Sequence, residues 1–163
     1  MTQSSWPFYE QDEIDAVSEV LSSGRVNYWT GENGKAFEQE FAEHCEAKHA
    51  IALGNGTLAL ELALEASGIG SGDDVIVTPR TFIASASCVV RLGARPVFAD
   101  VSLGSQNIPP DSVEAVLTPN TRAIIAVHHA GWPCDMDGLM ALAEPHDLLV
   151  IEECAQAPGA TYQ

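Results

Sequence analysis

Short apolar segments alternate with amphipathic segments along the chain from about residue 49 onward. The apolar segments are typical of parallel strands buried on both faces, and they are predicted at His49–Leu53, Asp74–Thr78, Arg95–Ala99, Ala123–His128 and Leu148–Glu152. Helices are predicted between them at Thr57–Ser67, Phe82–Leu92, Asp111–Leu117 and Met136–Glu144. This repetition predicts an α/β fold with a mostly parallel sheet and flanking helices.

Two further helices are predicted upstream, at Asp12–Leu21 and Gly34–Ala47, because apolar residues recur on one face of each. The segment between them, residues 22–34, is rich in Gly, Asn and aromatic residues. Its aromatic content favours a packed or binding loop over a free linker.

The chain is strongly acidic, with 7 Lys and Arg against 23 Asp and Glu and a formal net charge of −16. This charge repels nucleic acid and anionic lipid surfaces, so neither is expected as a partner. Solubility alone is an equally good explanation of the acidic excess. A site for a phosphate ligand would need its own local positive potential, which backbone amides can supply.

The sequence offers no membrane span and no signal peptide, so a cytoplasmic protein is expected. Its four cysteines are far apart in the sequence and form no Cys-x-x-Cys pair. We therefore expect reduced, mostly buried thiols and no metal site.

The first strand end with unusual residues is Gly54-Asn55-Gly56-Thr57, which leads directly into a predicted helix. Glycines allow close approach to the backbone, and the amides at a helix start together with the Thr57 hydroxyl can hold an anion. A tight turn with Thr57 as the helix cap explains the same residues without a ligand.

Two other strand ends carry aromatic or histidine residues. Phe82 stands at the start of a predicted helix, where it could stack on a flat cofactor or belong to the core. His128 and His129 precede Gly131, and they could belong to a site or to a polar loop before a helix capped by Asp135.

Two acids, Glu152 and Glu153, end a strongly hydrophobic strand. A buried carboxylate is costly unless it has a cationic partner, and a protonated pyridine nitrogen is such a partner. Because side chains alternate across a strand, the two acids should point to different faces, and only one is expected to serve a ligand.

Several motifs follow one another along the chain: FEQEFAEHCEAKHAIALGNGTLALELAL, GDDVIVTPRTFIASA, GARPVFADV, HHAGWPCDMDGL and VIEECAQAPGA. In this order and at these spacings, the chain from about Arg25 onward resembles the DegT/DnrJ/StrS family of pyridoxal-phosphate (PLP) sugar aminotransferases. The resemblance implies an incomplete large domain of the aspartate-aminotransferase-like fold type I. Residues 1–33 would form an N-terminal helix and loop arm, and residues 34–163 would form the partial PLP-binding large domain.

The resemblance also implies roles for five residues toward PLP. Gly56 and Thr57 would bind its phosphate, and Phe82 would stack on its pyridine ring. Glu153 stands where the family usually has the Asp that pairs with the pyridine nitrogen. Gln156 would lie near the 3-oxygen.

His128 matches the histidine that precedes the family's glycine loop, which makes it a candidate substrate or site residue. No catalytic residue is expected within these residues, because the family's Schiff-base lysine would lie beyond Gln163. Lys35 and Lys48, the two lysines in the sequence, match no such position and are expected to be surface charges. The chain alone is therefore expected to lack transaminase activity.

The resemblance implies a parent protein that transfers an amino group, typically from glutamate, to a nucleotide-linked keto sugar in amino-sugar biosynthesis, and that forms a homodimer. One alternative is a lysine-less sugar dehydratase of the same family. Another is a non-catalytic or dinucleotide-binding α/β domain, although the glycine cluster at residues 68–72 precedes a strand rather than following one.

Overall fold

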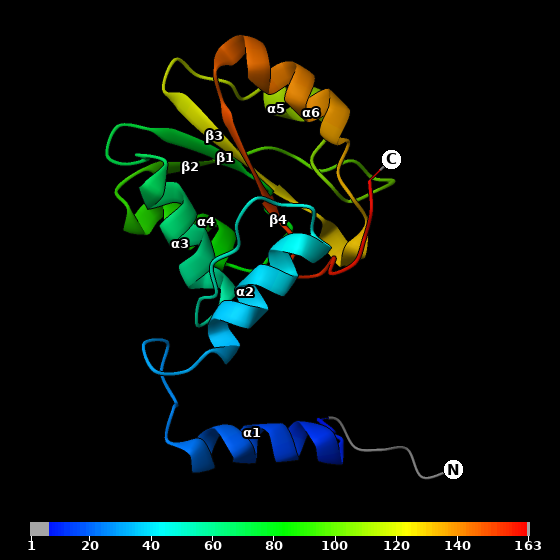
Figure 1. Cartoon of the computed structure of the whole chain (residues 1–163). Helices are drawn as coiled ribbons and strands as arrows, with labels where there is room; N and C mark the ends of the chain where they lie inside the picture. The colour runs from blue at the N-terminus through cyan, green and yellow to red at the C-terminus, as the bar shows by residue number, and fades with distance from the viewer. Residues whose placement is uncertain (1–6, 163) are drawn as a thin grey trace. The chain divides into compact units, whose positions relative to one another are not determined.

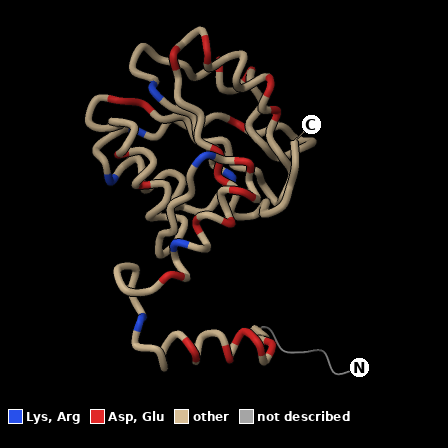
Figure 2. Tube along the Cα trace, viewed as in Figure 1, with Lys and Arg blue, Asp and Glu red and all other residues tan. Residues whose placement is uncertain are grey.

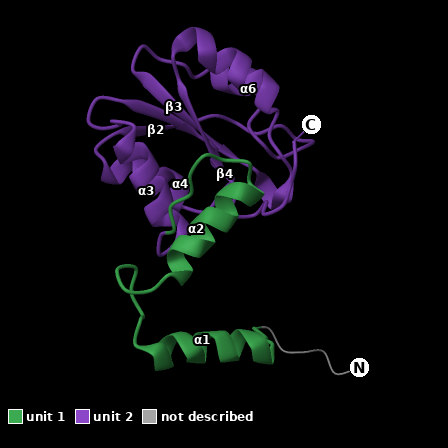
Figure 3. Ribbon diagram, in the orientation of Figure 1, with its two compact units in different colours: residues 1–52 green, residues 53–163 purple. Residues whose placement is uncertain are grey.

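The computed structural model describes residues 7–162 and divides into two compact units, residues 1–52 and 53–163 (Figure 3). The first unit contains the helices α1 (Gln11–Ser23) and α2 (Asn33–His44). The domain division predicted after residue 33 concerns the PLP-binding large domain and stays a prediction. None of the helices in the described residues is both long and apolar enough to cross a membrane.

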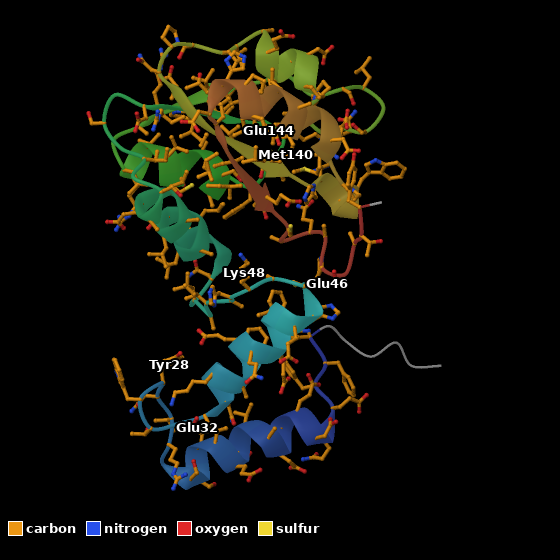
Figure 4. The ribbon with its side chains drawn as sticks, turned by 45° about the horizontal axis from the view of Figure 1, so that its top comes forward. Tyr28, Glu32, Glu46, Lys48, Met140 and Glu144 are labelled. Carbon is orange, nitrogen blue, oxygen red and sulfur yellow. The ribbon has the colours of Figure 1, made fainter. Side chains whose placement is uncertain are left out.

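In the first unit, α1 begins with a capping box in which Glu10 and Glu13 satisfy each other's backbone amides. The helix ends at Gly24, whose φ of 69° is the left-handed conformation that glycine adopts without strain. The loop before α2 is held by Tyr28, whose hydroxyl donates to Glu38 at 2.9 Å. Figure 4 labels Tyr28 and Glu32 near the start of α2.

The strand predicted at His49–Leu53 is wrong, because the structure has no strand there. A strand needs a neighbouring strand for its backbone hydrogen bonds, and the described strands pair only with one another, within residues 74–153. Ile51 and Leu53 are correspondingly exposed, Ile51 by 70%.

The second unit is built on a four-stranded sheet in the order β2-β1-β3-β4, with every pair parallel (Figure 1). The strands are β1 (Asp74–Val77), β2 (Arg95–Phe98), β3 (Thr121–Val127) and β4 (Leu149–Glu153). The other four predicted strands are thus confirmed, as is the parallel α/β class. The central strand β3 is buried at every residue but Arg122, which agrees with its nearly continuous apolar sequence.

Helices cover both faces of this sheet. On one face lie α3 (Gly56–Ala66) and α4 (Ala84–Arg91), and on the other lie α5 (Pro110–Glu114) and α6 (Met136–Ala143). Two separate core clusters result from the alternation of side chains along the strands. The α3/α4 face buries Val75, Val77, Ala123, Ile125 and Val127, and the α5/α6 face buries Ile76, Ile124 and Ala126.

An ion pair links the first residues of β1 and β2 at the amino-terminal end of the sheet. Asp74 is only 2% exposed and accepts hydrogen bonds from Nε and Nη2 of Arg95 at 2.7 and 2.6 Å. The Thr118 hydroxyl donates to the same carboxylate. The hydrogen bonds from Arg95 hold the pKa of Asp74 below its ordinary value, against the opposing effect of burial.

Candidate functional site

The carboxyl ends of the four strands meet at one edge of the sheet, and the chain leaves β1 and β3 toward opposite faces there. After β1 it enters α4, whereas after β3 it enters α6 on the other face. Neighbouring parallel strands whose connections diverge in this way form a topological switch point, the usual ligand position in open α/β sheets. The turn at residues 78–82 and the loop at residues 128–134 flank this switch point.

Two contacts across the edge involve His129. Its Nε2 accepts a hydrogen bond from Nε of Arg80, which lies in the turn after β1, at 3.2 Å. Its backbone amide donates to Oδ1 of Asn107 at 3.0 Å, and Nδ2 of Asn107 donates to the carbonyl of Trp132 at 2.7 Å. Asn107 is 3% exposed, so a buried amide fixes both ends of the loop after β3.

The loop after β3 is also bound to the loop after β4. The Ala130 amide donates to Oε1 of Gln156 at 2.7 Å, and the His128 amide donates to the carbonyl of Glu153 at 3.1 Å. At Gly131 a Cβ would lie 3.2 Å from the carbonyl oxygen of Gln156, and its φ of 82° also favours glycine. The structure therefore brings Gln156, Glu153 and the histidine loop together.

The strand register separates the two acids at the end of β4. Glu152 pairs with Ala126, which faces α5 and α6, whereas Glu153 pairs with Val127, which faces α3 and α4. The alternation expected from the sequence is confirmed. Glu153 thus shares a face with the helix that begins at Gly56. Its Oε1 accepts from the Ala155 amide at 2.8 Å.

His128 lies with Glu152 on the other face and uses both ring nitrogens. Its Nδ1 accepts from the Cys134 amide at 3.0 Å, so the hydrogen belongs on Nε2, which donates to Glu152 at 2.8 Å. The residue is 5% exposed. A role for His128 as a substrate residue stays a prediction, and these contacts favour a supporting role for it.

A cluster of three potential metal ligands surrounds this pair. Ligand atoms of His128, Glu152 and Cys154 lie within 4.8 Å of one another. The His128 to Glu152 hydrogen bond accounts for the proximity of two of them without an ion. Nearby, burial raises the pKa of the Cys134 thiol to about 12.

Gly56 and Thr57 are the first two residues of α3. Asn55 caps this helix by accepting from the Leu58 amide at 3.0 Å, and the amides of Gly56 and Thr57 have no partner in the described residues. Leu60 and Leu64 pack with Val75 and Val77, and α3 ends just before the amino end of β1. The helix start therefore points toward the carboxyl edge of the sheet (Figure 1).

Neither the packing around Gly56 nor its backbone conformation requires a glycine. A Cβ there would meet no atom within 4 Å, and the backbone is not in the left-handed region. The missing side chain leaves open space beside the Thr57 hydroxyl and two amides that are unpaired among residues 7–162, and such a set of groups fits the phosphate of PLP. Phe82, 69% exposed in the turn after β1, presents a ring surface that the described residues do not cover.

Sequence reasoning missed Arg80 and Asn107. Arg80 stands within a motif that was read for its aromatic residue, and its partner is 49 residues away in sequence. Asn107 lies outside every predicted element, in an irregular connection between β2 and α5. A buried asparagine in such a connection can be found only once its partners are known. Figure 2 shows how few positive charges stand among the acidic ones in this unit.

Comparison with known proteins adds three findings. The sequence profile of the DegT/DnrJ/EryC1/StrS aminotransferase family matches residues 7–163. GDP-perosamine synthase of Caulobacter vibrioides is 46% identical over 160 residues, which cover 96% of this chain and 42% of that protein. A crystal structure of the aminotransferase from Psychrobacter cryohalolentis is 64% identical with a TM-score of 0.96, over 98% of this chain and 40% of that one.

A further solved structure carries the cofactor. NtdA from Bacillus subtilis, solved with bound pyridoxamine phosphate (PMP), is 31% identical with a TM-score of 0.87, over 93% of this chain and 35% of that one. The chain thus spans about 40% of the length of the relatives that it matches.

Proposed function

Because the chain belongs to the DegT/DnrJ/EryC1/StrS aminotransferase family, we propose that it supplies the cofactor-binding half of a transaminase that aminates a nucleotide-linked keto sugar. Its fold is part of the fold type I PLP-dependent large domain. The PMP bound in NtdA supports PLP as the proposed cofactor. Relatives that make amino sugars, such as GDP-perosamine synthase, support the proposed substrate class. We take glutamate as the proposed amino donor.

The observation that carries the proposal is the shared face of Glu153 and α3. Gly56 and Thr57 would hold the cofactor phosphate with their amides and hydroxyl, and Phe82 would cover the ring. Glu153 would stand opposite the pyridine nitrogen and keep its proton in place, while Gln156 would orient the 3-oxygen. When bound, PLP supplies an electron sink for the transfer of the amino group.

Glu153 is one methylene longer than the Asp usual in this family. Its Oε1 accepts from the Ala155 amide at 2.8 Å, so the backbone of its own loop restrains the longer side chain. This contact leaves Oε2 for the pyridinium, and the negative charge stays within the strand end. We infer that Glu153 performs the role of that Asp.

The amine needed for transamination is proposed to lie outside these 163 residues. Lys35 is exposed and pairs with Glu32 at 3.1 Å, and Lys48 is exposed as well. Neither belongs to the unit that holds Glu153. The proposed protein would act as a homodimer in the cytoplasm.

The test uses the whole protein that contains this chain, loaded with PLP. We expect the visible absorbance of bound PLP, its replacement by the spectrum of PMP when glutamate is added, and recovery with a nucleotide-linked keto sugar. Bound PLP that glutamate does not convert, together with loss of water from the sugar, would instead establish the dehydratase. Failure to bind PLP or PMP at all would favour a non-catalytic domain.

A further inference from the structure

Arg80 lies in the turn beside the switch point, and its charge has no ionic partner among residues 7–162. Of the four arginines in residues 53–163, Arg91 and Arg95 form ion pairs with Glu61 and Asp74 at 2.9 and 2.6 Å. Within the described residues, Arg80 forms no ion pair, and its single side-chain hydrogen bond uses Nε. Both Nη groups of an exposed arginine are therefore left for another acceptor.

The geometry at Arg80 is fixed from two sides. Its backbone amide donates to the Thr78 hydroxyl at 3.0 Å, which holds the turn after β1. Its Nε donates to Nε2 of His129, and the loop that carries His129 is fixed by Asn107. When Nε of a guanidinium is already hydrogen-bonded, its two Nη groups remain at the outer end of the planar group. There they can bind a carboxylate or phosphate as a fork.

The partner of Arg80 is unusual for so acidic a chain. With 23 acids against 7 basic residues, an exposed arginine has many carboxylates to pair with, yet this one contacts a neutral acceptor. Because Nε2 of His129 accepts, the ring hydrogen lies on Nδ1, which is buried without a partner in the described residues. The ring is therefore neutral and orients Arg80 without neutralising its charge.

We propose that Arg80, oriented by His129, binds an anionic group of the substrate at the switch point between the ends of β1 and β3. This inference rests on the proposed function, which supplies two sources of such an anion. They are the diphosphate of the nucleotide-linked sugar and a carboxylate of the amino donor. Arg80 stands two residues before Phe82, in the turn that would also hold the cofactor ring.

The experiment measures anion binding to the whole protein in its PMP form, by calorimetry at low ionic strength. Inorganic pyrophosphate represents the diphosphate and glutarate represents the donor. The variant is Arg80→Gln, and the matched control is Arg122→Gln. Arg122 is also exposed without an ion pair in the described residues, but it lies at the amino end of β3.

We expect Arg80→Gln to weaken binding of at least one anion roughly tenfold, because a charge-assisted fork is lost. Arg122→Gln should leave both affinities unchanged, and Arg80→Lys should restore binding only in part. Loss confined to pyrophosphate assigns Arg80 to the nucleotide, and loss confined to glutarate assigns it to the donor.

The proposal is overturned if Arg80→Gln binds both anions as tightly as the unchanged protein. It is also overturned if the unchanged protein binds PMP but neither anion. Binding of PMP and its formation from PLP are measured separately in the same preparations. A protein that fails to bind PMP, yet binds an anion through Arg80, would contradict the proposed function and leave the Arg80 site standing.

Discussion

The Glu152 carboxylate accepts a hydrogen bond from Nε2 of His128 at 2.8 Å, on the face of the sheet opposite Glu153. One of two adjacent acids is thus bound to a buried side chain, and the other is available to a ligand. The two residues form a natural pair for mutation, because they share a strand end and a chemical type.

We predict that Glu153→Gln weakens binding of the cofactor roughly tenfold or more, because the charge proposed to pair with the pyridine nitrogen is lost. Gln can still accept from the Ala155 amide, so the fold should be preserved. Glu152→Gln also keeps its contact with His128 and should leave cofactor affinity unchanged. Titration with PMP, followed by fluorescence, measures both. Equal effects of the two changes would contradict the assignment.

Gly56→Ala should separate stability from binding. The new Cβ meets no atom within 4 Å, and the helical backbone suits alanine, so we expect a gain in unfolding free energy of about 0.4 kcal/mol or more. Affinity for PMP should fall, because the methyl group takes space beside the phosphate amides.

The matched control for Gly56 is Gly138→Ala, near the start of α6. A Cβ at that position would lie 2.6 Å from both Oδ2 of Asp135 and Cγ of Pro110, so this change should destabilise the protein. Its effect on PMP affinity should be small. Urea denaturation and PMP titration give the two readouts. Unchanged PMP affinity in Gly56→Ala would contradict the proposed binding of the cofactor phosphate at Gly56.

The ion pair at the amino end of the sheet predicts a pH dependence of stability. Arg95 lowers the pKa of Asp74 in the folded protein. The resulting stabilisation is present above the ordinary pKa of aspartate, about 4, and is lost as pH falls through the lower folded value. Asp74→Asn should therefore destabilise the protein clearly at neutral pH and much less in strong acid.

The urea concentration at the midpoint of unfolding, measured from neutral pH to strong acid, tests this prediction. Asp111→Asn is the control. Asp111 is exposed, and within the described part of the chain its side chain accepts one hydrogen bond, from the Ser112 amide. A destabilisation by Asp74→Asn that does not change with pH would show that the ionised carboxylate contributes nothing beyond its shape.

Asn107→Ala should destabilise the protein by about 1–3 kcal/mol, because the carbonyl of Trp132 and the amide of His129 lose their buried partner. The loop after β3 should also open more often. Hydrogen exchange at His129 measures this opening directly. Loss of stability without faster exchange at that amide would contradict the conclusion that Asn107 holds the loop after β3 in place.

Much of the parallel sheet could be predicted, because β1, β3 and their neighbours are apolar segments separated by helices. The strand predicted at His49–Leu53 failed for a physical reason. Its sequence resembles the others, but strand formation depends on a partner, which composition does not encode. The local pattern of apolar residues thus predicts an extended backbone, and pairing with a neighbouring strand decides whether a strand forms.

The positions of Glu153 at the end of β4 and of Gln156 in the loop after it agree with the predicted strand end, whereas Gly56 follows no strand in the structure. The roles of all three toward a cofactor stay predictions. The alternation of Glu152 and Glu153 followed from the geometry of any strand. The sequence did not predict which of the two acids faces α3 and α4, because that depends on which helices pack on which face of the sheet. The contact of Arg80 with His129 depends on the order of the strands in the sheet, which no local motif specifies.

The central strand has one further consequence. Because β3 pairs with β1 on one side and β4 on the other, its backbone is bonded along both edges. Its amides, like those of β1, which pairs with β2 and β3, should be among the last to exchange with deuterated solvent in this unit. The loop that carries His129 continues directly from it. An opening of this loop can therefore occur while the hydrogen bonds of β3 stay intact.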